Sequence, residues 1–180
     1  MIFGKYNSDY KLRESVTPGG RTSTEAVYVG SYFRFADRAA AVRTVHRAAV
    51  VLALAAAAYI VPLVVFGDIL RKWYVIIPLV LDVLPLSQLI ACTAAAYAAR
   101  DGRVTRKGKD KISERLAPWS AVLMILSSLS LAGQIFFDVT GSLGWLNAIV
   151  HVCTAVLIAA GAALYKMRDG FRMTVDSAAE

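Results

Sequence analysis

Four long apolar stretches alternate with shorter polar segments along this chain. The stretches cover residues 48–66, 73–99, 118–137 and 145–165. A helix needs about 20 apolar residues to cross a hydrocarbon layer of roughly 30 Å, and each stretch approaches or exceeds that length. Helices of soluble proteins keep a polar face at 3.6-residue spacing, which these stretches lack over most of their length. We therefore predict an all-α integral membrane protein with four transmembrane helices over these ranges.

The connections between the stretches predict how the helices pack. Residues 67–72 and 138–144 form short loops, so the first helix should lie against the second and the third against the fourth. We expect an antiparallel four-helix bundle within a transmembrane domain of residues 37–165. Asp37 is expected to be the N-cap of a helix that extends the first span beyond its apolar part.

The first 36 residues follow a different pattern. Tyr10–Val16 and Thr22–Val29 show partial two-residue alternation, and Thr17–Arg21 between them is rich in turn formers. The pattern predicts a small β-hairpin, with a disordered tail as the alternative. Because an isolated hairpin is only marginally stable in water, we expect this one to lie on a surface of the protein itself or of a partner subunit.

The distribution of charge predicts an orientation. Of the 20 lysines and arginines, only two lie in the two short loops, and the others lie in residues 1–47, 100–117 and 166–180. This is the positive-inside pattern, so we expect both termini, the basic loop 100–117 and the tail 166–180 to be cytoplasmic. The first apolar stretch also begins too late in the chain for a cleavable signal peptide.

Composition changes the interpretation of the net charge of +7. With 57% hydrophobic and only 18% charged residues, the chain is far more apolar than a typical soluble protein. The positive charge is therefore expected to orient the chain in a lipid bilayer and not to bind nucleic acid. The alanine-rich spans suit a bacterial inner membrane.

Small and weakly polar residues recur at helical spacing within the spans. Ala49, Ala53 and Ala57 repeat every four residues in the first span, and such residues let neighbouring transmembrane helices approach closely. In the third span, Ser120, Ser127 and Gln134 repeat every seven residues. We expect these three side chains to form a buried polar seam between helices.

The second span carries an aspartate between two prolines. Asp82, Pro78 and Pro85 share one face at helical spacing. Each proline removes a backbone hydrogen bond and is expected to kink the helix. Since the freed backbone groups are costly in lipid, this face should meet protein or water.

Depth in the membrane places Asp82 near His151. At about 1.5 Å per residue, Asp82 lies roughly 13 Å from the start of its span and His151 roughly 9 Å from the start of the fourth. The two face each other if the second and fourth helices are neighbours, with Gln134 and Asn147 nearer the outer surface. One interpretation is an outward-opening polar cavity in which Asp82 binds a cation or exchanges a proton, with His151 as relay. The other is structural, with Asp82 capping freed backbone groups or contacting a basic residue of another subunit.

The basic loop offers a second candidate site. Its candidate docking residues are Arg103, Arg106, Lys107, Lys109 and Lys111. Each basic residue near an anionic leaflet contributes about 1 kcal/mol of attraction, so the loop could dock on lipid headgroups or on an acidic partner surface. The alternative is that these charges serve orientation alone.

Motifs that mark an enzyme are missing from the chain. It has no HExxH, no GxSxG and no Walker lysine loop, and its two cysteines form no Cys/His cluster for a metal. We expect no enzymatic activity, cofactor or metal. The sequence favours a non-enzymatic subunit or accessory of a larger membrane assembly, with a membrane-protein partner or further copies of itself. The alternative is a small oligomeric transporter, or an ion- or proton-conducting protein, that uses Asp82 and His151.

Overall fold

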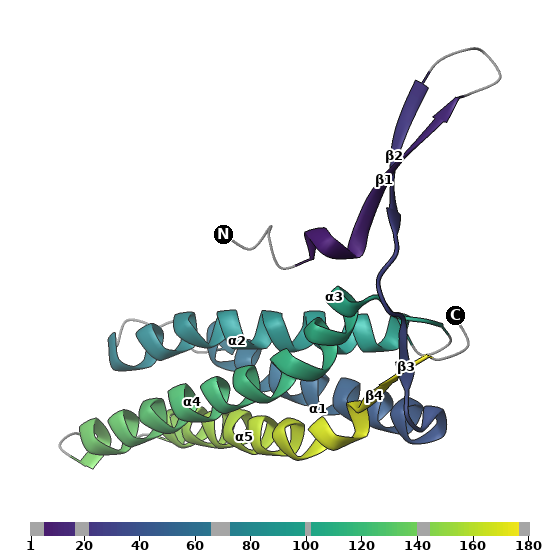
Figure 1. Cartoon of the computed structure of the whole chain (residues 1–180). Coiled ribbons are helices and arrows are strands. Elements are labelled where there is room, and N and C mark those ends of the chain that lie inside the picture. The colour runs from purple at the N-terminus through teal and green to yellow at the C-terminus, as the bar shows by residue number, and fades with distance from the viewer. Residues whose placement is uncertain (1–5, 17–21, 66–72, 100–101, 140–144, 177–180) are drawn as a thin grey trace.

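Four long helices and two small sheets make up the fold (Figure 1). The computed structural model describes residues 6–16, 22–65, 73–99, 102–139 and 145–176. The long helices are α1 (Arg38–Val65), α2 (Trp73–Ala98), α4 (Arg115–Val139) and α5 (Trp145–Met167). Strands β1 (Tyr10–Val16) and β2 (Thr22–Tyr28) form one sheet, and β3 (Phe33–Phe35) and β4 (Met173–Val175) form the other.

The four long helices confirm the prediction of helices suited to a membrane. Each lies in a helical stretch that is long and apolar enough to cross a bilayer. Their outer surfaces are apolar, and the exposed side chains include Val64, Val80, Leu129 and Val152. Water would disfavour so much exposed hydrocarbon, whereas lipid tails accept it. The fold therefore has the surface expected of an integral membrane protein.

Helix α1 begins ten residues before the apolar stretch that predicted it. The Ala40 N–H donates to Asp37 Oδ1 at 2.9 Å, and the Ala41 N–H donates to the Asp37 carbonyl at 2.9 Å. Asp37 is thus the N-cap, as predicted, and it satisfies one of the amide groups that a helix start leaves without an internal partner.

The predicted basic loop 100–117 is wrong in its second part, which is helical. Helix α3 (Arg106–Lys109) and a π-helical turn (Asp110–Glu114) run directly into α4. The Thr105 side chain caps this stretch by accepting from the Gly108 N–H at 3.4 Å. A glycine inside a helix costs only about 1 kcal/mol, and here a Cβ at Gly108 would collide with the Val104 side chain. Gly108 therefore marks a close contact, where the sequence suggested a break.

The predicted tail 166–180 is also more ordered than expected over its described part. After α5, a 3₁₀ turn (Arg168–Phe171) leads into β4, which pairs antiparallel with β3 so that Phe33 lies opposite Val175. Phe33 also forms a β-bridge with Val104. We call β3, β4 and Val104 the terminal junction, because they join segments from the two ends and the middle of the chain.

The N-terminal hairpin has the predicted strands, with Tyr10 opposite Tyr28 and Leu12 opposite Ala26. Among the described residues, its base contacts the helices. There the Tyr6 hydroxyl donates to Asp110 Oδ2 at 2.7 Å, and the Arg106 N–H donates to the Tyr28 hydroxyl at 3.0 Å. Figure 1 shows the two strands projecting away from the bundle. Of the two surfaces expected for the hairpin, that of a partner subunit therefore remains a prediction, because the described strands do not lie along their own helices.

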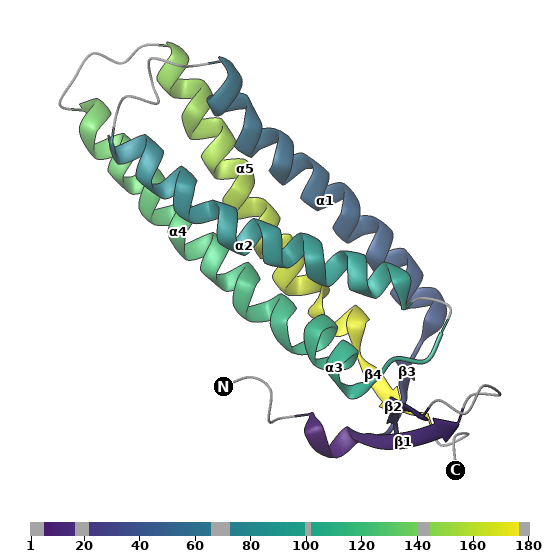
Figure 2. The same cartoon turned by 90° about the horizontal axis from the view of Figure 1, so that it is seen from above.

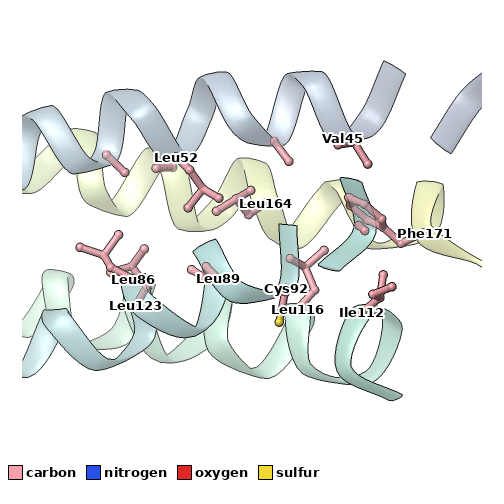
Figure 3. Packing of buried hydrophobic residues seen from close by; sticks show 14 of the residues in the cluster. Val45, Leu52, Leu86, Leu89, Cys92, Ile112, Leu116, Leu123, Leu164 and Phe171 are labelled. Carbon is pink, nitrogen blue, oxygen red and sulfur yellow. The ribbon is translucent and has the colours of Figure 1, made fainter. Parts of the chain in front are cut away.

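The helices surround an apolar core that runs toward the terminal junction (Figures 2 and 3). Helix α4 packs against both α2 and α5, α1 packs against α5 and less extensively against α2, and α2 and α5 lie diagonally opposite. The buried core includes Leu52, Leu89, Leu123 and Leu164, and Phe171 closes it at the junction end. The predicted contact of the third span with the fourth is the strongest, whereas the contact of the first with the second is the weakest of the four.

A glycine sets the close approach of α4 and α5. A Cβ added at Gly161 would lie 2.7 Å from Met124 Cγ and 3.1 Å from the Ser120 carbonyl oxygen. By contrast, a Cβ at Gly133 of α4 would meet nothing within 4 Å. The two glycines thus provide a matched pair of sites, one crowded and one open.

We predict that Gly161→Ala lowers the free energy of unfolding by about 1–3 kcal/mol, because the added methyl group forces the helices apart. Gly133→Ala should leave stability unchanged or raise it by up to about 1 kcal/mol through helix propensity. Thermal unfolding in mild detergent, followed by circular dichroism, measures both. Equal effects of the two substitutions would show that close packing at Gly161 does not matter.

Candidate functional site

A row of polar side chains lies buried between α2, α4 and α5, and we call it the polar seam. Its buried members are Asp82 of α2; Ser120, Ser127, Ser130, Gln134 and Asp138 of α4; and Asn147 and Thr154 of α5. The prediction of a buried serine and glutamine seam on the third span is confirmed. With apolar residues outside and polar residues inside, the bundle has the arrangement that lipid requires.

Asp82 lies within the seam and is 2% exposed. The Ser127 hydroxyl donates to its Oδ2 at 3.2 Å, which links α2 to α4. The other carboxylate oxygen, Oδ1, is buried and has no hydrogen-bond partner among the described residues. A buried polar atom without a partner is costly, so this oxygen is the least satisfied position of the seam.

Gln134 connects α4 to α5. Its Nε2 donates to the Ser130 hydroxyl at 2.9 Å and to the Thr154 hydroxyl at 3.3 Å. The Thr154 hydroxyl in turn donates to the Val150 carbonyl at 2.9 Å. Because each donor meets an acceptor on a neighbouring turn or helix, this part of the seam holds α4 against α5.

Asp138, Asn147 and His151 form what we call the carboxylate cluster, near the far end of the bundle from the terminal junction. Asn147 Nδ2 donates to Asp138 Oδ1 at 2.8 Å. His151 Nε2 lies 3.1 Å from Asp138 Oδ2, an ion-pair distance once the imidazole is protonated, although the approach lacks hydrogen-bond direction. Both oxygens of the Asp138 carboxylate therefore face groups that can donate a proton or carry positive charge.

Space beside the carboxylate cluster is very small. A hollow of about 10 Å³ is lined by Asp138, Asn147, His151 and Gln134, with Tyr74 and Val75 of α2 on the other side. A cavity of that size holds about one water molecule at most. The arrangement can exchange a proton or hold a single small species, but it is not a passage for a larger solute.

The predicted site residues divide into two groups. Gln134, Asn147 and His151 line the same hollow, as expected from their depth. Asp82 does not join them, because α2 and α5 are diagonal and the described partner of its carboxylate is Ser127. The condition set for a pairing of Asp82 with His151, that the second and fourth spans are neighbours, is not met, and Asp138 of α4 occupies the position opposite His151.

Asp138 is the site residue that sequence reasoning left out of the candidate set. It lies four residues after Gln134 and so continues the polar face of α4 by one turn. That signal was visible, but Asp138 falls at the start of a predicted loop, where an acidic residue needs no partner. The helix continues to Val139, which places the carboxylate inside the bundle.

The two prolines lie inside α2, which continues through both of them. Pro85 is buried beside Asp82, Leu89 and Cys92 on the inward face, while Pro78 is half-buried. The expectation that this face meets protein is confirmed. The kinks expected at Pro78 and Pro85 remain predictions.

The structure separates the basic docking candidates. Arg103 pairs with Asp176 of the C-terminal segment at 2.6 Å, and Lys109 lies over the Phe33 ring at 4.8 Å from its centroid. The side chains of Arg106, Lys107 and Lys111 are exposed. Arg106, Lys107 and Lys111 are thus exposed without a described contact to the terminal junction, whereas Arg103 and Lys109 contact the junction or the segment beside it, and Arg103 stays half exposed.

We predict that Asp138→Ala destabilises the bundle by about 2–5 kcal/mol, because it leaves Asn147 without its acceptor in a buried site and removes the carboxylate 3.1 Å from His151. Asp169→Ala is the matched control, since Asp169 forms an exposed pair with Arg172 at 3.0 Å. Exposed pairs contribute about 0–1 kcal/mol. Thermal unfolding in detergent compares the two, and a similar small loss for both would contradict a structural role of the carboxylate cluster.

Within the described part of the chain, no group of three His, Cys, Asp or Glu side chains could hold a metal ion. Cys92 and Cys153 are both free and buried. The chain matches no protein-family model, no curated protein and no solved structure. The functional argument therefore depends on the residues and contacts described above.

Proposed function

We propose that this protein is a non-enzymatic integral membrane protein that acts as a subunit or accessory of a larger membrane assembly. The observation that carries the proposal is the projecting hairpin of β1 and β2 (Figure 1). In this proposal, the distribution of charge gives the orientation of the protein. Both termini and the terminal junction are cytoplasmic, and the membrane is a bacterial inner membrane.

The hairpin presents an apolar face that its own chain leaves open. Tyr10, Leu12, Ala26 and Tyr28 share this face, since directly opposed residues of a strand pair point to the same side. Leu12 is 77% exposed and Tyr10 is 41% exposed. Two strands alone are marginally stable, and their outer edges carry backbone groups that can pair with another strand. A partner protein that covers the hairpin would satisfy both requirements.

A groove on the membrane face of the bundle adds support for a protein partner. It lies between α1 and α2, has a volume of about 490 Å³ and is lined mainly by small and aliphatic side chains. Ala49, Ala53 and Ala56 form its α1 wall, and Ile90 and Ala94 belong to its α2 wall. Small side chains permit close helix contact in membranes, so a transmembrane helix of the partner is the occupant that fits.

The polar seam supports the same proposal because it encloses little space. Its groups bond mainly to each other, and the hollow at the carboxylate cluster measures only about 10 Å³. A transport pathway needs polar walls around space for its substrate. A closed seam instead holds helices in register, which is the property a subunit needs.

A second candidate function is a small oligomeric transporter or an ion- or proton-conducting protein. The observation in its favour is Asp82, because its Oδ1 atom is buried without a hydrogen-bond partner among the described residues. An ionisable group at membrane depth costs about 2.5–3.5 kcal/mol or more, and many such groups bind an ion or carry a proton.

Flux measurements distinguish the two functions. Under the subunit proposal, the purified protein alone in liposomes shows no proton or cation flux above that of protein-free vesicles. Asp82→Asn should then leave the folded protein intact, because an amide can still bond to Ser127. A flux that is present in the wild type and lost in Asp82→Asn would replace the subunit proposal with the transporter.

Co-purification tests the subunit proposal directly. We expect the full-length protein, isolated from its native membrane in mild detergent, to carry a stoichiometric membrane-protein partner. Leu12→Glu should weaken the affinity for the partner roughly thirtyfold, the effect of losing an interface contact of about 2 kcal/mol, and so lower the fraction of the protein that carries the partner. Mass spectrometry of the intact complex measures the occupancy.

Lys11→Glu provides the matched control, because Lys11 is exposed on the opposite face of the same strand. It should retain the partner, and both variants should keep the thermal stability of the wild type. A homogeneous homo-oligomer without any partner, or equal retention by the two variants, would count against the proposal.

A further inference from the structure

A basic pocket lies where the terminal junction meets the start of α1. It has a volume of about 500 Å³ and is lined by segments that are distant in sequence. Its lining comes from Arg34, Phe35, Ala36, Arg38, Gly102, Arg103, Thr174 and Asp176. Pairing of β3 with β4 places Arg34 directly opposite Thr174, so both point to the same side of the sheet.

Positive charge dominates the described lining of this pocket. Arg34, Arg38 and Arg103 contribute three guanidinium groups against the single carboxylate of Asp176. Asp176 is 5% exposed, and its N–H donates to the Tyr32 carbonyl at 2.9 Å, so the aspartate is fixed in the wall. Its carboxylate holds Arg103 Nε at 2.6 Å and lies 3.8 Å from Arg34 Nε. One acid thus orders two of the three arginines in the described lining.

The amino end of α1 lies at the pocket. Arg38 is the first residue of the 28-residue helix, whose start carries about half a positive elementary charge, and the carboxylate of the N-cap Asp37 offsets that charge. The arginine side chains at the rim are also accessible, since Arg34 is 61% exposed and Arg103 is 50% exposed. An aspartate that holds one side of an arginine guanidinium group fixes its position. The side that is open to solvent can then bind an anion.

We propose that this pocket binds a phosphate group. Guanidinium groups form paired, charge-assisted hydrogen bonds with phosphate oxygens, and several arginines around one cavity are the usual means of holding a dianion. The volume accommodates a phosphate together with part of the molecule that carries it. The proposal concerns the pocket alone and does not depend on the hairpin or on the proposed function.

The level of the pocket relative to the membrane defines two sources of phosphate. Arg38 lies ten residues before the apolar stretch that starts at Ala48, or about 15 Å along the helix axis. The hydrocarbon layer is flanked by roughly 5–8 Å of headgroups on each side, so the pocket lies roughly 7–10 Å beyond the headgroup layer, on its aqueous side. The two sources are therefore a soluble phosphate monoester, which reaches the pocket through water, and a phosphate monoester headgroup of a lipid at the nearby surface.

Ligand-dependent thermal stability of the full-length protein tests the site. The soluble probes are inorganic phosphate and glycerol phosphate, added in detergent at constant ionic strength with chloride as reference. The lipid probe is phosphatidate in phosphatidylcholine nanodiscs, compared with phosphatidylcholine alone. We expect at least one of the two sources to raise the melting temperature in a saturable manner. Protection by phosphatidate only would identify a headgroup site, and protection by the soluble probes would identify a soluble ligand.

Two arginines of one helix provide the decisive comparison. Arg38→Gln should weaken binding of the protective probe about tenfold or more, the loss expected for a charge-assisted hydrogen bond. Arg43→Gln removes the same charge from an exposed position of α1 that does not line the pocket, and it should bind the probe as the wild type does.

Thr174→Glu tests whether Arg38→Gln loses binding for a reason other than misfolding. Thr174 is exposed in the pocket wall, so a glutamate there adds negative charge and removes no arginine. We expect this variant to lose probe binding at a wild-type melting temperature measured without probe. No protection by any probe, or equal binding by Arg38→Gln and Arg43→Gln, would overturn the proposal.

Discussion

The fold depends on the need to satisfy polar groups without water. Inside a bilayer, a polar side chain that faces lipid has no partner, so the polar residues of the spans must meet one another. Gln134 meets Ser130 and Thr154, and Asp138 meets Asn147 and His151. Leucine and valine side chains can then face outward, because lipid tails are as apolar as these side chains and no hydrophobic effect drives them inward.

The order of the helices follows from the same constraint. Helix α4 supplies most of the seam, and its polar residues find partners on α2 through Asp82 and on α5 through Asn147 and Thr154. It therefore packs against both of these helices, which leaves α2 and α5 diagonal. Gly161 permits the close α4–α5 contact, since a larger residue would meet the backbone at Ser120. Helix α1 takes no described part in the seam and is held by apolar packing.

Outside the membrane, the terminal junction has a different physical basis. Backbone pairing of β3 with β4, the bridge to Val104 and the burial of Phe33, Phe35 and Phe171 connect three parts of the chain. Water is available here, so arginines can gather around one ordered aspartate without the penalty they would meet in lipid. The three proposed contact surfaces are thus separated by environment. In the proposed topology, the groove faces lipid, the basic pocket lies on the aqueous side of the headgroups and the hairpin projects into water.

The sequence by itself determined the features that arise from neighbouring residues. Apolar length predicted the four helices, the Asp37 cap followed from its position before a helical pattern, and alternation predicted the two strands of the hairpin. Helical spacing also placed Asp82 and the Ser127 seam on inward faces. Each of these features depends on how side-chain direction repeats along one helix or strand, which the sequence of that segment shows.

Only the tertiary structure decided which distant groups meet. His151 faces Asp138 and not Asp82, because helix order is chosen by the sum of contacts across the bundle. The three-residue strands β3 and β4 are too short for alternation to reveal them, and their pairing is what creates the basic pocket. Likewise, only the packed structure shows that Val104 leaves no space for a side chain at Gly108. Depth along a helix can be counted from sequence, but the identity of the neighbour at that depth depends on packing in three dimensions.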